Sequence, residues 1–455
     1  MSAVIRESSS AGTVPLATGD GARTIVFDPA SGALPLSRFL SQVRALAALL
    51  PEGRHAINLC EDRHRFMLAF CAASLRGQAT LLPPSRAPAE IGREVARHAD
   101  SYCIGDLEHD LEPPRYWRMP MWLDGIDGEV PRVDADALAA IGFTSGSTGE
   151  PGAHPKTWAS FRASTAQNLD AMRDLWPADA RAHVVATVPS QHMYGMEMTV
   201  LLPLLADVAV HSGRPFFPHD IIQALHDVPA PRVLVTTPVH LRALVDACSA
   251  DPSMQPPALA AIVSATAPMP AELAAAAEAR FGCELREFFG STETCVIASR
   301  RSACDGAWRP LPGVRLQPQP DGCLVHALHL AAPVALADLV DVGQDGSFAL
   351  RGRNADLLEI AGKRASLGDL TRKLQAIPGV VDGVVFQADA GNAGGVRRIA
   401  ALAVAPGMRE NAILEALRHC IDPVFLPRPL RCVDALPRNA TGKLPQALLQ
   451  ALLDR

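Results

Sequence analysis

The chain has 455 residues, a net charge of −6 and a pI of about 6.2, and this length exceeds one ordinary hydrophobic core, indicating roughly two to four structural units. The slightly acidic balance gives no overall electrostatic basis for nucleic-acid binding, and no run of about 18 uninterrupted apolar residues could span a membrane. The N-terminal stretch MSAVIRESSSAGTVPLATGDG lacks the continuous apolar segment of a secretory signal, so we expect a cytoplasmic protein.

The composition favours a helix-rich α/β protein, because 48% of the residues are hydrophobic and only 5% are aromatic. The ten cysteines form no C-x-x-C pair, and none stands at zinc-finger spacing from a histidine. We therefore expect reduced thiols, neither a disulfide framework nor a zinc site.

Strand-like and helix-like segments alternate along the first three quarters of the chain. Residues 51–84 read as strand, helix and strand, and further strand-like runs occupy 183–189, 232–238 and 259–268. An Ala-rich helix is predicted over 270–282, with a glycine stop at its end. This alternation predicts parallel sheets wrapped by helices, in which ligands gather at the carboxyl ends of the strands.

The pattern changes near residue 350. DGSFALRGR predicts a hairpin, and it is followed by a charged stretch, a helix, a turn at Pro378–Gly379 and another strand. These elements predict a small α+β unit of about a hundred residues. We place the boundary at Gly352 and Arg353, which gives domains 1–352 and 353–455.

The segment GFTSGSTGEPGAHPKTW, residues 142–158, follows the strand-like run LAAIGF. Its glycines let backbone amides turn inward and its hydroxyls add donors, a combination that suits phosphate oxygens. These candidate donors are Thr144, Ser145, Gly146, Ser147, Thr148 and Gly149, and Lys156 would add a positive charge on a flexible stem. The pattern G-x-x-x-x-G-K-[ST] is not matched, so a hydroxyl-rich surface loop is the alternative interpretation.

Two later segments favour the phosphate interpretation. They are EFFGSTETC, residues 287–295, and LPRNATGKLPQALL, residues 436–449. Together with the loop, and in this order, they resemble the adenylate-forming superfamily of acyl-CoA synthetases, peptide-synthetase adenylation domains and luciferases, over about residues 140–455. The resemblance implies an α/β fold with a large N-terminal domain of helix-wrapped β-sheets and a small, mobile α+β C-terminal domain.

The resemblance also implies ATP and Mg²⁺ as cofactors and assigns roles to individual residues. The loop from Thr144 to Gly149 would close over the β- and γ-phosphates, with Lys156 as a further phosphate contact. Thr292 would contact the α-phosphate and Glu293 would bind Mg²⁺, which prefers one or two carboxylates plus phosphate oxygens. Lys443 falls on the catalytic lysine.

Further positions concern the ribose, the hinge and the thiol. The ribose carboxylate falls on Asp338, with Asp341 as the competing candidate. Arg353 would lie at the domain junction, and the hinge position is Ala355, followed by Asp356, where the superfamily has Asp or Lys. GKRASL resembles the glycine-rich turn that approaches the thiol tunnel, through Gly362 and Arg364.

The segment VPSQHMYGME, residues 188–197, resembles the acid-binding motif. It lacks the Asp that pairs the substrate ammonium in amino-acid-activating members, and a buried ammonium without a partner would be costly, so an α-amino acid is not expected. In VSATAPMP, residues 263–270, the usual Gly-Gly-Ala-Pro turn is replaced, which favours a compact acid. The expected pocket residues are His192, Tyr194, Gly195, Ser264, Ala265, Thr266 and Gly290, with a packed polar residue as the alternative for His192.

The short chain and its loop are similar to ligases of aryl-polyene and xanthomonadin-type pigment pathways. We therefore expect an enzyme that adenylates an aryl acid, 3- or 4-hydroxybenzoate, and transfers the acyl group to the phosphopantetheine thiol of an acyl carrier protein. One alternative is an acyl-CoA synthetase that uses free CoA and a fatty or aryl acid. Others are an enzyme that stops at the adenylate or uses another acceptor, and a catalytically silent module that binds nucleotide or acyl-adenylate.

Overall fold

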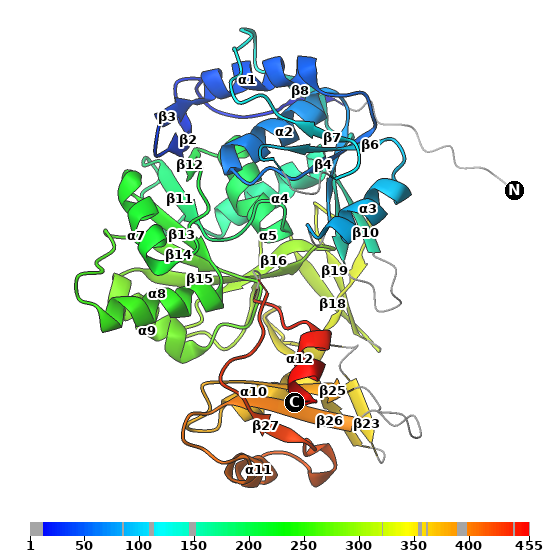
Figure 1. Cartoon of the computed structure of the whole chain (residues 1–455), viewed down its shortest axis with the longest axis vertical. Coiled ribbons are helices and arrows are strands. Elements are labelled where there is room, and N and C mark those ends of the chain that lie inside the picture. Colours follow the sequence, from blue (N-terminus) through cyan, green and yellow to red (C-terminus); the bar gives the residue numbers. More distant parts are fainter. Residues whose placement is uncertain are drawn as a thin grey trace, which may run out of the picture. The chain divides into compact units, whose positions relative to one another are not determined.

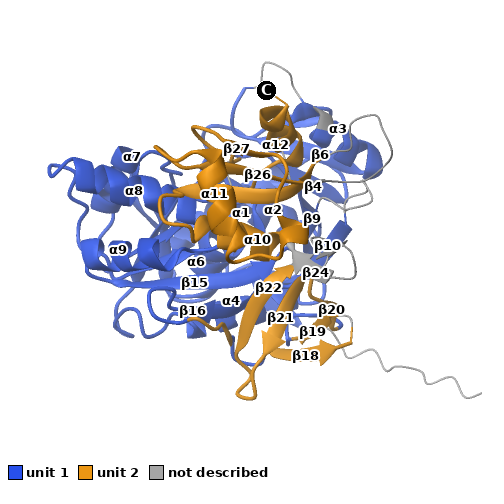
Figure 2. Ribbon diagram, turned by 90° about the horizontal axis from the view of Figure 1, so that it is seen from below, with its two compact units in different colours: residues 1–305, 310–314, 327–332 blue, residues 306–309, 315–326, 333–455 orange. Residues whose placement is uncertain are grey.

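The computed structural model describes residues 12–83, 86–108, 113–144, 152–320, 322–353, 357–360, 363–388, 398–439 and 442–454. The chain divides into two compact units, which Figure 2 shows in different colours. Unit 1 comprises residues 1–305, 310–314 and 327–332, and unit 2 comprises 306–309, 315–326 and 333–455.

The first sheet of unit 1 has six strands in the order β10-β9-β5-β4-β6-β7. The strand, helix and strand predicted over 51–84 are confirmed, and they are β4 (His55–Asn58), α2 (Arg63–Leu75) and β5 (Ala79–Leu82). The other strands are β6 (Ser101–Gly105), β7 (Tyr116–Arg118), β9 (Leu138–Thr144) and β10 (Gly152–Thr157). All neighbours are parallel except β9 and β10, which pair antiparallel, so the chain reverses direction between Thr144 and Gly152.

A nine-stranded sheet has the order β17-β16-β15-β14-β13-β11-β12-β2-β3. The strands are β2 (Thr24–Asp28), β3 (Gly32–Pro35), β11 (Ala182–Ala186), β12 (Val208–His211), β13 (Arg232–Thr236), β14 (Ala261–Ser264), β15 (Glu284–Ser291), β16 (Cys295–Arg300) and β17 (Arg309–Pro310). The run from β15 to β2 is parallel throughout. The strands predicted near 183, 232 and 259 are thus confirmed as neighbours in one parallel sheet.

Helices cover this sheet, as the fold class predicts. Figure 1 shows α7 (Pro218–Asp227), α8 (Pro238–Ala250) and α9 (Ala271–Phe281) beside the strands, and their apolar side chains share a core with Leu234, Ile262 and Leu285. Alternate strand residues such as Val235 and Val263 join a larger core on the opposite face. The remaining helices of unit 1 are α1 (Leu36–Leu49), α3 (Pro88–Arg97), α4 (Trp158–Asp170), α5 (Met193–Met196), the π-helical turn η1 (Glu197–Leu201) and α6 (Leu202–Leu205), and β1 (Thr13–Pro15) pairs with β8 (Arg132–Asp134).

Local sequence signals explain where several of these helices begin and end. The Asp62 side chain caps α2 by accepting a hydrogen bond from the backbone N–H of Arg65 at 2.9 Å, and Thr157 caps α4 in the same way. Helix α9 ends at Gly282, whose φ of 65° is the left-handed conformation that glycine adopts without a steric penalty. The predicted glycine stop is therefore confirmed.

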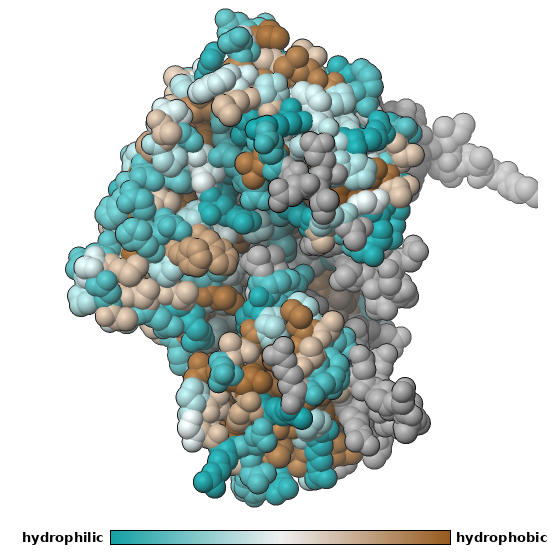
Figure 3. Space-filling view, in the orientation of Figure 1, coloured by the Kyte–Doolittle hydropathy of each residue, from teal (hydrophilic) through white to brown (hydrophobic). Residues whose placement is uncertain are grey.

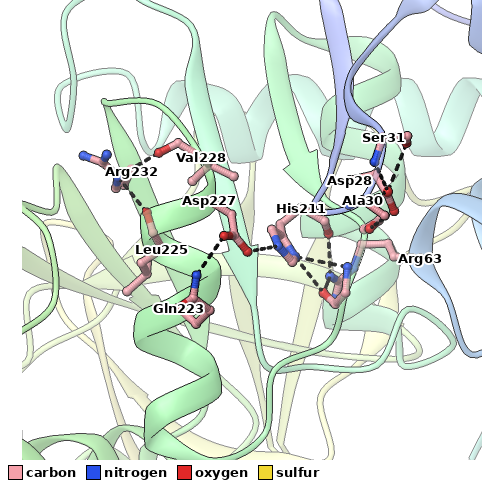
Figure 4. A network of polar contacts seen from close by, with 12 residues as sticks. Asp28, Ala30, Ser31, Arg63, His211, Gln223, Leu225, Asp227, Val228 and Arg232 are labelled. Atoms are coloured by element: carbon pink, nitrogen blue, oxygen red, sulfur yellow. Dashed lines mark hydrogen bonds and ion pairs between the residues drawn. The ribbon is translucent and has the colours of Figure 1, made fainter. Parts of the chain in front are cut away.

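A buried arginine ties α2 to the large sheet. Arg63, 2% exposed, donates hydrogen bonds to the backbone carbonyls of His211 and Gly213 at the end of β12 and just beyond it, and to those of Ala186 and Val188 at the end of β11 and just beyond it. Figure 4 shows Arg63 beside His211, whose Nε2 lies 3.2 Å from Asp227. The segment that leaves β11 toward residues 188–197 is therefore held by hydrogen bonds from this buried guanidinium.

In the described part of unit 2, the strands form four small antiparallel or mixed sheets, and there are three α-helices. One three-stranded sheet consists of β18 (Arg315–Gln319), β19 (Gly322–His326) and β20 (Val334–Ala335), and another consists of β25 (Asp382–Ala388), β26 (Arg398–Val404) and β27 (Leu430–Cys432). The two other sheets are strand pairs: β21 (Asp338–Val342) with β22 (Phe348–Arg353), and β23 (Leu357–Ile360) with β24 (Lys363–Ser366). The helices are α10 (Leu367–Gln375), α11 (Glu410–Arg418) and α12 (Gln446–Leu453), and residues Pro423–Phe425 form the 3₁₀ turn η3. The hairpin, helix and strand predicted after residue 345 are all present.

The compact units divide the chain earlier than the boundary predicted at Gly352 and Arg353, because β18 to β22 belong to unit 2. That boundary remains a prediction about where the chain would hinge. On the face shown in Figure 3, apolar residues lie in small groups among polar ones. Among the helices that the structure describes, none has the length and apolar character to cross a membrane.

Candidate functional site

The segment GSTE lies on a tight turn between two antiparallel strands of unit 1. β15 and β16 pair up to Ser291 and Cys295, leaving Thr292 and Glu293 near the tip. A Cβ on Gly290 would come within 2.1 Å of the Cys295 carbonyl oxygen, so this position requires glycine. Two hydrogen bonds of 3.1 Å close the turn. The Ser291 backbone N–H donates to Thr294 Oγ1, and the Ser291 and Thr294 hydroxyls bond to each other.

The Glu293 carboxylate lies beside residues on either side of the predicted phosphate loop, residues 144–149. His154 Nε2 lies 3.6 Å from Glu293 Oε1 and 3.0 Å from Thr144 Oγ1. Partial burial raises the pKa of Glu293, but hydrogen bonds within the turn, the His154 ring and Thr144 outweigh it, so the pKa is lowered overall. The group is therefore an ionised, partly accessible carboxylate at neutral pH.

Strand alternation on β10 decides where Lys156 lies. Gly152, His154 and Lys156 share one face of the strand, and burial increases along it until Lys156 is only 3% exposed. Its ammonium donates to the backbone carbonyl oxygen of Glu293 at 2.7 Å. Lys156, which the sequence predicts as a phosphate contact, thus lies beneath the GSTE turn, where its ammonium is bound to a backbone carbonyl oxygen.

A buried carboxyl group lies below the same turn. Glu197, on η1 and 1% exposed, accepts hydrogen bonds from Asn168 Nδ2 at 2.9 Å and from the backbone N–H of Val296 at 3.2 Å. Burial raises its pKa to about 7, against the opposing effects of these hydrogen bonds and of nearby Lys156. Single π-helical turns of this kind are frequent at functional sites.

His329 completes the support of the turn. Its Nε2 lies 2.7 Å from the Thr294 carbonyl oxygen and its Nδ1 lies 2.6 Å from Gln167 Oε1, while Gln167 Nε2 donates to Pro312 O at 2.8 Å. We call Lys156, Gln167, Asn168, Glu197 and His329 the turn support. These five residues come from four separate segments and hold the backbone of residues 293–296 from below.

The acid motif occupies α5 and the segment before it. Tyr194, 5% exposed, donates its hydroxyl to the Val263 carbonyl oxygen at 3.0 Å, and burial raises its pKa far above the usual range. A Cβ on Gly195 would lie 2.0 Å from the Pro189 carbonyl oxygen. A Cβ on Gly142 would meet Thr292 Cγ2 at 2.5 Å and Met193 Cε at 3.1 Å, so β9, the GSTE turn and the acid motif approach one another at this glycine.

A row of hydroxyl groups lies where three parallel strands end. Thr187 follows β11, and Thr236 and Ser264 are register partners at the ends of β13 and β14. Thr187 and Thr236 hydroxyls are 3.0 Å apart, and His240 Nδ1 on α8 lies 2.8 Å from Thr187 Oγ1. Ser264 Oγ is fully buried and has no hydrogen-bond partner among the described residues, which is a costly arrangement for a hydroxyl.

We call Thr187, Thr236, His240 and Ser264 the hydroxyl row. Burial, followed by the charge of Arg214, lowers the pKa of His240, so its ring is neutral near pH 7. Beside the row, Ala265 is 7% exposed and Thr266 has a φ of 81°, a strained value for a β-branched residue. His192 is half-buried at the start of α5.

The other predicted site residues lie in unit 2. Asp338 is the register partner of Arg353 across β21 and β22, while the carboxylate of the competing candidate, Asp341, lies 2.5 Å from Arg351 Nε. Arg364 lies on β24, opposite Glu359. Ser145, Gly146, Ser147, Thr148 and Gly149, as well as Ala355, Asp356 and Gly362, lie outside the described residues.

Lys443 lies at the end of a short turn in unit 2. Its backbone N–H donates to Asn439 Oδ1 at 2.9 Å, and its carbonyl accepts from Asn439 N at 2.8 Å. Arg438 donates to the Gly442 carbonyl at 2.9 Å and makes a bidentate contact with Asp382 at 2.9 Å. Asn439 and the Arg438–Asp382 contact therefore hold the ends of this turn, while the Lys443 residue itself is exposed.

Comparison with known proteins decides the family. Residues 37–335 match the family described as AMP-binding enzyme. The chain belongs to the AMP-binding enzyme family. This finding confirms the resemblance to the adenylate-forming superfamily and the expectation of an enzyme.

Curated relatives of this AMP-binding enzyme include two 4-coumarate–CoA ligases. That of Halorhodospira halophila is 30% identical over 344 residues, which are 70% of this chain and 78% of the relative. That of Rhodobacter capsulatus is 31% identical over 261 residues, 57% of this chain, and the match spans 64% of the relative's length. A crystal structure of ATP-bound MatB from Rhodopseudomonas palustris shares the fold, with a TM-score of 0.79, 18% identity and 96% coverage of both chains.

The fit of Mg²⁺ to this AMP-binding enzyme can be tested on Glu293. The described residues contain no group of three or more His, Cys, Asp or Glu that could hold a metal ion. Mg²⁺ does not need one, because it is held by one or two carboxylates together with substrate phosphates. An ionised, partly accessible Glu293 beside Thr144 and Thr292 fits that requirement.

Sequence reasoning missed several residues of the AMP-binding enzyme. They are His154, Glu197, His329, Asn168 and the members Thr187, Thr236 and His240 of the hydroxyl row. The strand period could have placed His154 and Lys156 on one face, since they are two residues apart. No short-range signal indicates Glu197 or His329, whose partners lie 99 and 35 residues away in the sequence.

Proposed function

We propose that this enzyme adenylates a hydroxylated aryl acid, 3- or 4-hydroxybenzoate, and transfers the acyl group to the phosphopantetheine thiol of an acyl carrier protein. The observation that carries this proposal is the hydroxyl row, which lies at the carboxyl ends of three parallel strands, next to an acid motif whose one carboxyl group, Glu197, is buried and already bound by Asn168 and Val296. Ligands of such sheets bind at these strand ends.

The chemistry of the acid follows from the hydroxyl row. A neutral imidazole and three hydroxyl groups can each donate or accept a hydrogen bond, so they suit a neutral hydroxyl on the substrate. A fatty acid would leave the Ser264 hydroxyl without a partner, whereas a phenolic hydroxyl could satisfy it. Ala265 and the strained Thr266 favour a compact ring over a long chain.

The first reaction step joins the acid to AMP. A carboxylate oxygen attacks the α-phosphorus of ATP, a P–O bond to the β-phosphate breaks, and pyrophosphate leaves. Both reactants are anions, so the enzyme acts mainly by positioning them and by neutralising charge. In this proposal Thr292 and Thr144 to Gly149 hold the phosphates, and Lys443 bridges the carboxylate and the α-phosphate.

The remaining assignments complete the site. Asp338 holds the ribose hydroxyls in this proposal, and Asp341, whose carboxylate is paired with Arg351, is the competing candidate. Glu293 would hold Mg²⁺, which neutralises phosphate charge when it is bound. Arg353 marks the junction at which the C-terminal domain turns between the two half-reactions, with Ala355 as the hinge position.

The second step transfers the acyl group to sulfur. The thiol sulfur attacks the acyl-adenylate carbonyl, a thioester forms, AMP leaves and the thiol proton is released. Gly362 and Arg364 would line the thiol approach. The named relatives are CoA ligases, so free CoA is the alternative acceptor; the choice of a carrier protein follows the resemblance of the loop to pigment-pathway ligases.

Acid-dependent ATP–pyrophosphate exchange tests this proposal. We expect exchange with 3- or 4-hydroxybenzoate, at least tenfold weaker exchange with benzoate, and little with fatty or amino acids. His240→Phe should reduce the preference for hydroxybenzoate over benzoate, while Phe216, whose ring is 5.0 Å from that of His240, offers a neighbouring control as Phe216→Leu. Nucleotide binding without exchange for any acid would indicate a silent binding module.

The acceptor needs a separate assay on the same protein. Preformed aryl-adenylate is offered with either a phosphopantetheinylated carrier protein or free CoA, and thioester formation is followed by mass spectrometry. Faster transfer to the carrier protein is the expected result. Transfer to CoA alone would replace the carrier-protein assignment and leave the adenylation assignment unchanged.

A further inference from the structure

The position of Lys156 is unusual for a lysine of this chain. Only four of the 42 Lys and Arg residues are lysines, at 156, 363, 373 and 443. Lys156 is buried, whereas Lys373 is half-buried on α10, where it pairs with Asp369 at 3.0 Å. A buried charge is tolerated only when hydrogen bonds and an opposite charge compensate its desolvation.

The contacts of Lys156 supply this compensation, and they lie around the GSTE turn. Its Nζ donates to the Glu293 carbonyl oxygen at 2.7 Å, and the Glu197 carboxyl lies near enough to be influenced by its charge. Glu197 in turn binds the backbone N–H of Val296, and His329 binds the carbonyl of Thr294. The backbone on both sides of the Glu293 side chain is thus held by the turn support.

Fixing this backbone also orients the Glu293 carboxylate. The Glu293 carbonyl is held by Lys156, while its side chain lies beside His154 and Thr144. Lys156 therefore touches the residue through its main chain, and the side chain of Glu293 remains available to a cation. An ammonium suits this role because it is a compact point charge, whereas a planar guanidinium would require several acceptors in a fixed plane.

We propose that Lys156 is a positioning residue for adenylation, which holds the GSTE turn so that the Glu293 carboxylate can bind the Mg²⁺ of MgATP. Lys156 is not a phosphate ligand in this arrangement. The inference rests on the proposed function for the role of Glu293. In this chain, four residues separate Lys156 from Pro151, the last residue of the segment TSGSTGEP.

The first test is Lys156→Met, which removes the charge and keeps most of the apolar stem. We expect the Mg²⁺ concentration for half-maximal pyrophosphate exchange to rise about tenfold, as it does when groups that orient a metal ligand are removed. The KM for the acid should remain unchanged. Lys373→Met is the matched control and should leave both quantities as in the wild type.

A second readout does not depend on turnover. Isothermal titration calorimetry should show weaker binding of ATP to Lys156→Met in the presence of Mg²⁺, and equal binding in its absence. A direct phosphate contact would instead weaken ATP binding in both conditions, and that result would overturn the proposal. If the wild type exchanges with no acid, the proposed function fails, whereas the Mg²⁺ dependence of ATP binding still decides the role of Lys156.

The double variant Lys156→Met/Glu197→Gln guards against misfolding. Both buried ionisable groups are then absent, so no charge is left uncompensated and the melting temperature should be higher than that of Lys156→Met. The Mg²⁺ defect should persist in the double variant. Recovery of the wild-type Mg²⁺ dependence together with the melting temperature would show that Lys156 serves stability alone and would overturn the proposal.

Discussion

The GSTE turn of unit 1 and the Lys443 turn of unit 2 are stabilised in opposite ways. The first is held from below by five buried residues that come from β10, α4, η1 and the segment around residue 329. The second is held by Asn439 and by one part-exposed pair, Arg438 with Asp382. Residues with distant partners thus fix one turn, and near neighbours fix most of the other.

This difference indicates how the two turns can be used. Many buried long-range contacts make a segment rigid, and a rigid segment suits the binding of nucleotide phosphates and a cation. The described contacts of the Lys443 turn, with Asn439 and Asp382, lie within unit 2, so they persist when that unit moves. Lys443 is therefore presented by a turn that is held within unit 2, as the proposed domain alternation requires.

Removal of Lys443 should have the largest effect and tests the role proposed for the Lys443 turn. We expect Lys443→Ala to reduce acid-dependent pyrophosphate exchange about 100- to 1,000-fold, since the charge that stabilises the transition state is lost. Thioester formation from supplied aryl-adenylate should continue near the wild-type rate. Equal loss of both half-reactions would contradict the separation of the two turns.

Crowding at Gly142 tests the rigidity of the GSTE turn. Gly142→Ala places a methyl group 2.5 Å from Thr292 Cγ2, so the turn or β9 must shift. We expect exchange to fall about 10- to 100-fold, because small displacements of reacting groups are costly.

The matched control for this change is Gly92→Ala. Gly92 lies on α3 with no atom within 4 Å of the added Cβ, so the variant should exchange normally and be equally or slightly more stable. Normal exchange by Gly142→Ala would mean that the GSTE turn tolerates displacement.

Loosening the Lys443 turn should have a smaller effect. Arg438→Gln removes the contact with Asp382 and weakens the hold on the Gly442 carbonyl. We expect exchange to fall about fivefold with little change in melting temperature, since the lysine is retained but less well oriented. Arg372→Gln, which removes an exposed pair with Asp369 on α10, should be silent.

The pH dependence of stability should reveal the buried carboxyl below the GSTE turn. The folded state raises the pKa of Glu197 from its ordinary value of 4.5 to about 7, so its contribution is fully present below pH 4.5 and is lost as pH rises through 7. The loss is on the order of 3 kcal/mol, from the pKa difference.

Glu197→Gln should remove this part of the pH dependence and retain an acceptor for Asn168 and Val296. Urea unfolding of the wild type and the variant at pH 5 and pH 8 gives the comparison. Identical pH profiles would mean that the Glu197 pKa is close to its ordinary value in the folded protein. This effect is the smallest of the four on activity, because Glu197 faces the interior.

Several elements could be predicted because their signals are local. The strands near 183, 232 and 259 are apolar runs followed by helices, and Gly282 ends α9 because its backbone requires a left-handed conformation. The turns that carry Glu293 and Lys443 were located by short motifs. What these motifs could not provide is the environment of the side chains that they contain.

The sequence by itself determined the α/β class, the order of the motifs and the family, since these depend on periodicity and on short patterns. Only the tertiary structure decided that Lys156 lies under the GSTE turn, because its partner Glu293 is 137 residues away and the pairing of β10 with β9 sets the direction of its side chain. The same holds for the hydroxyl row, whose members become neighbours only when three strands align in parallel. Local chemistry selects the elements, and register between distant strands selects which side chains meet.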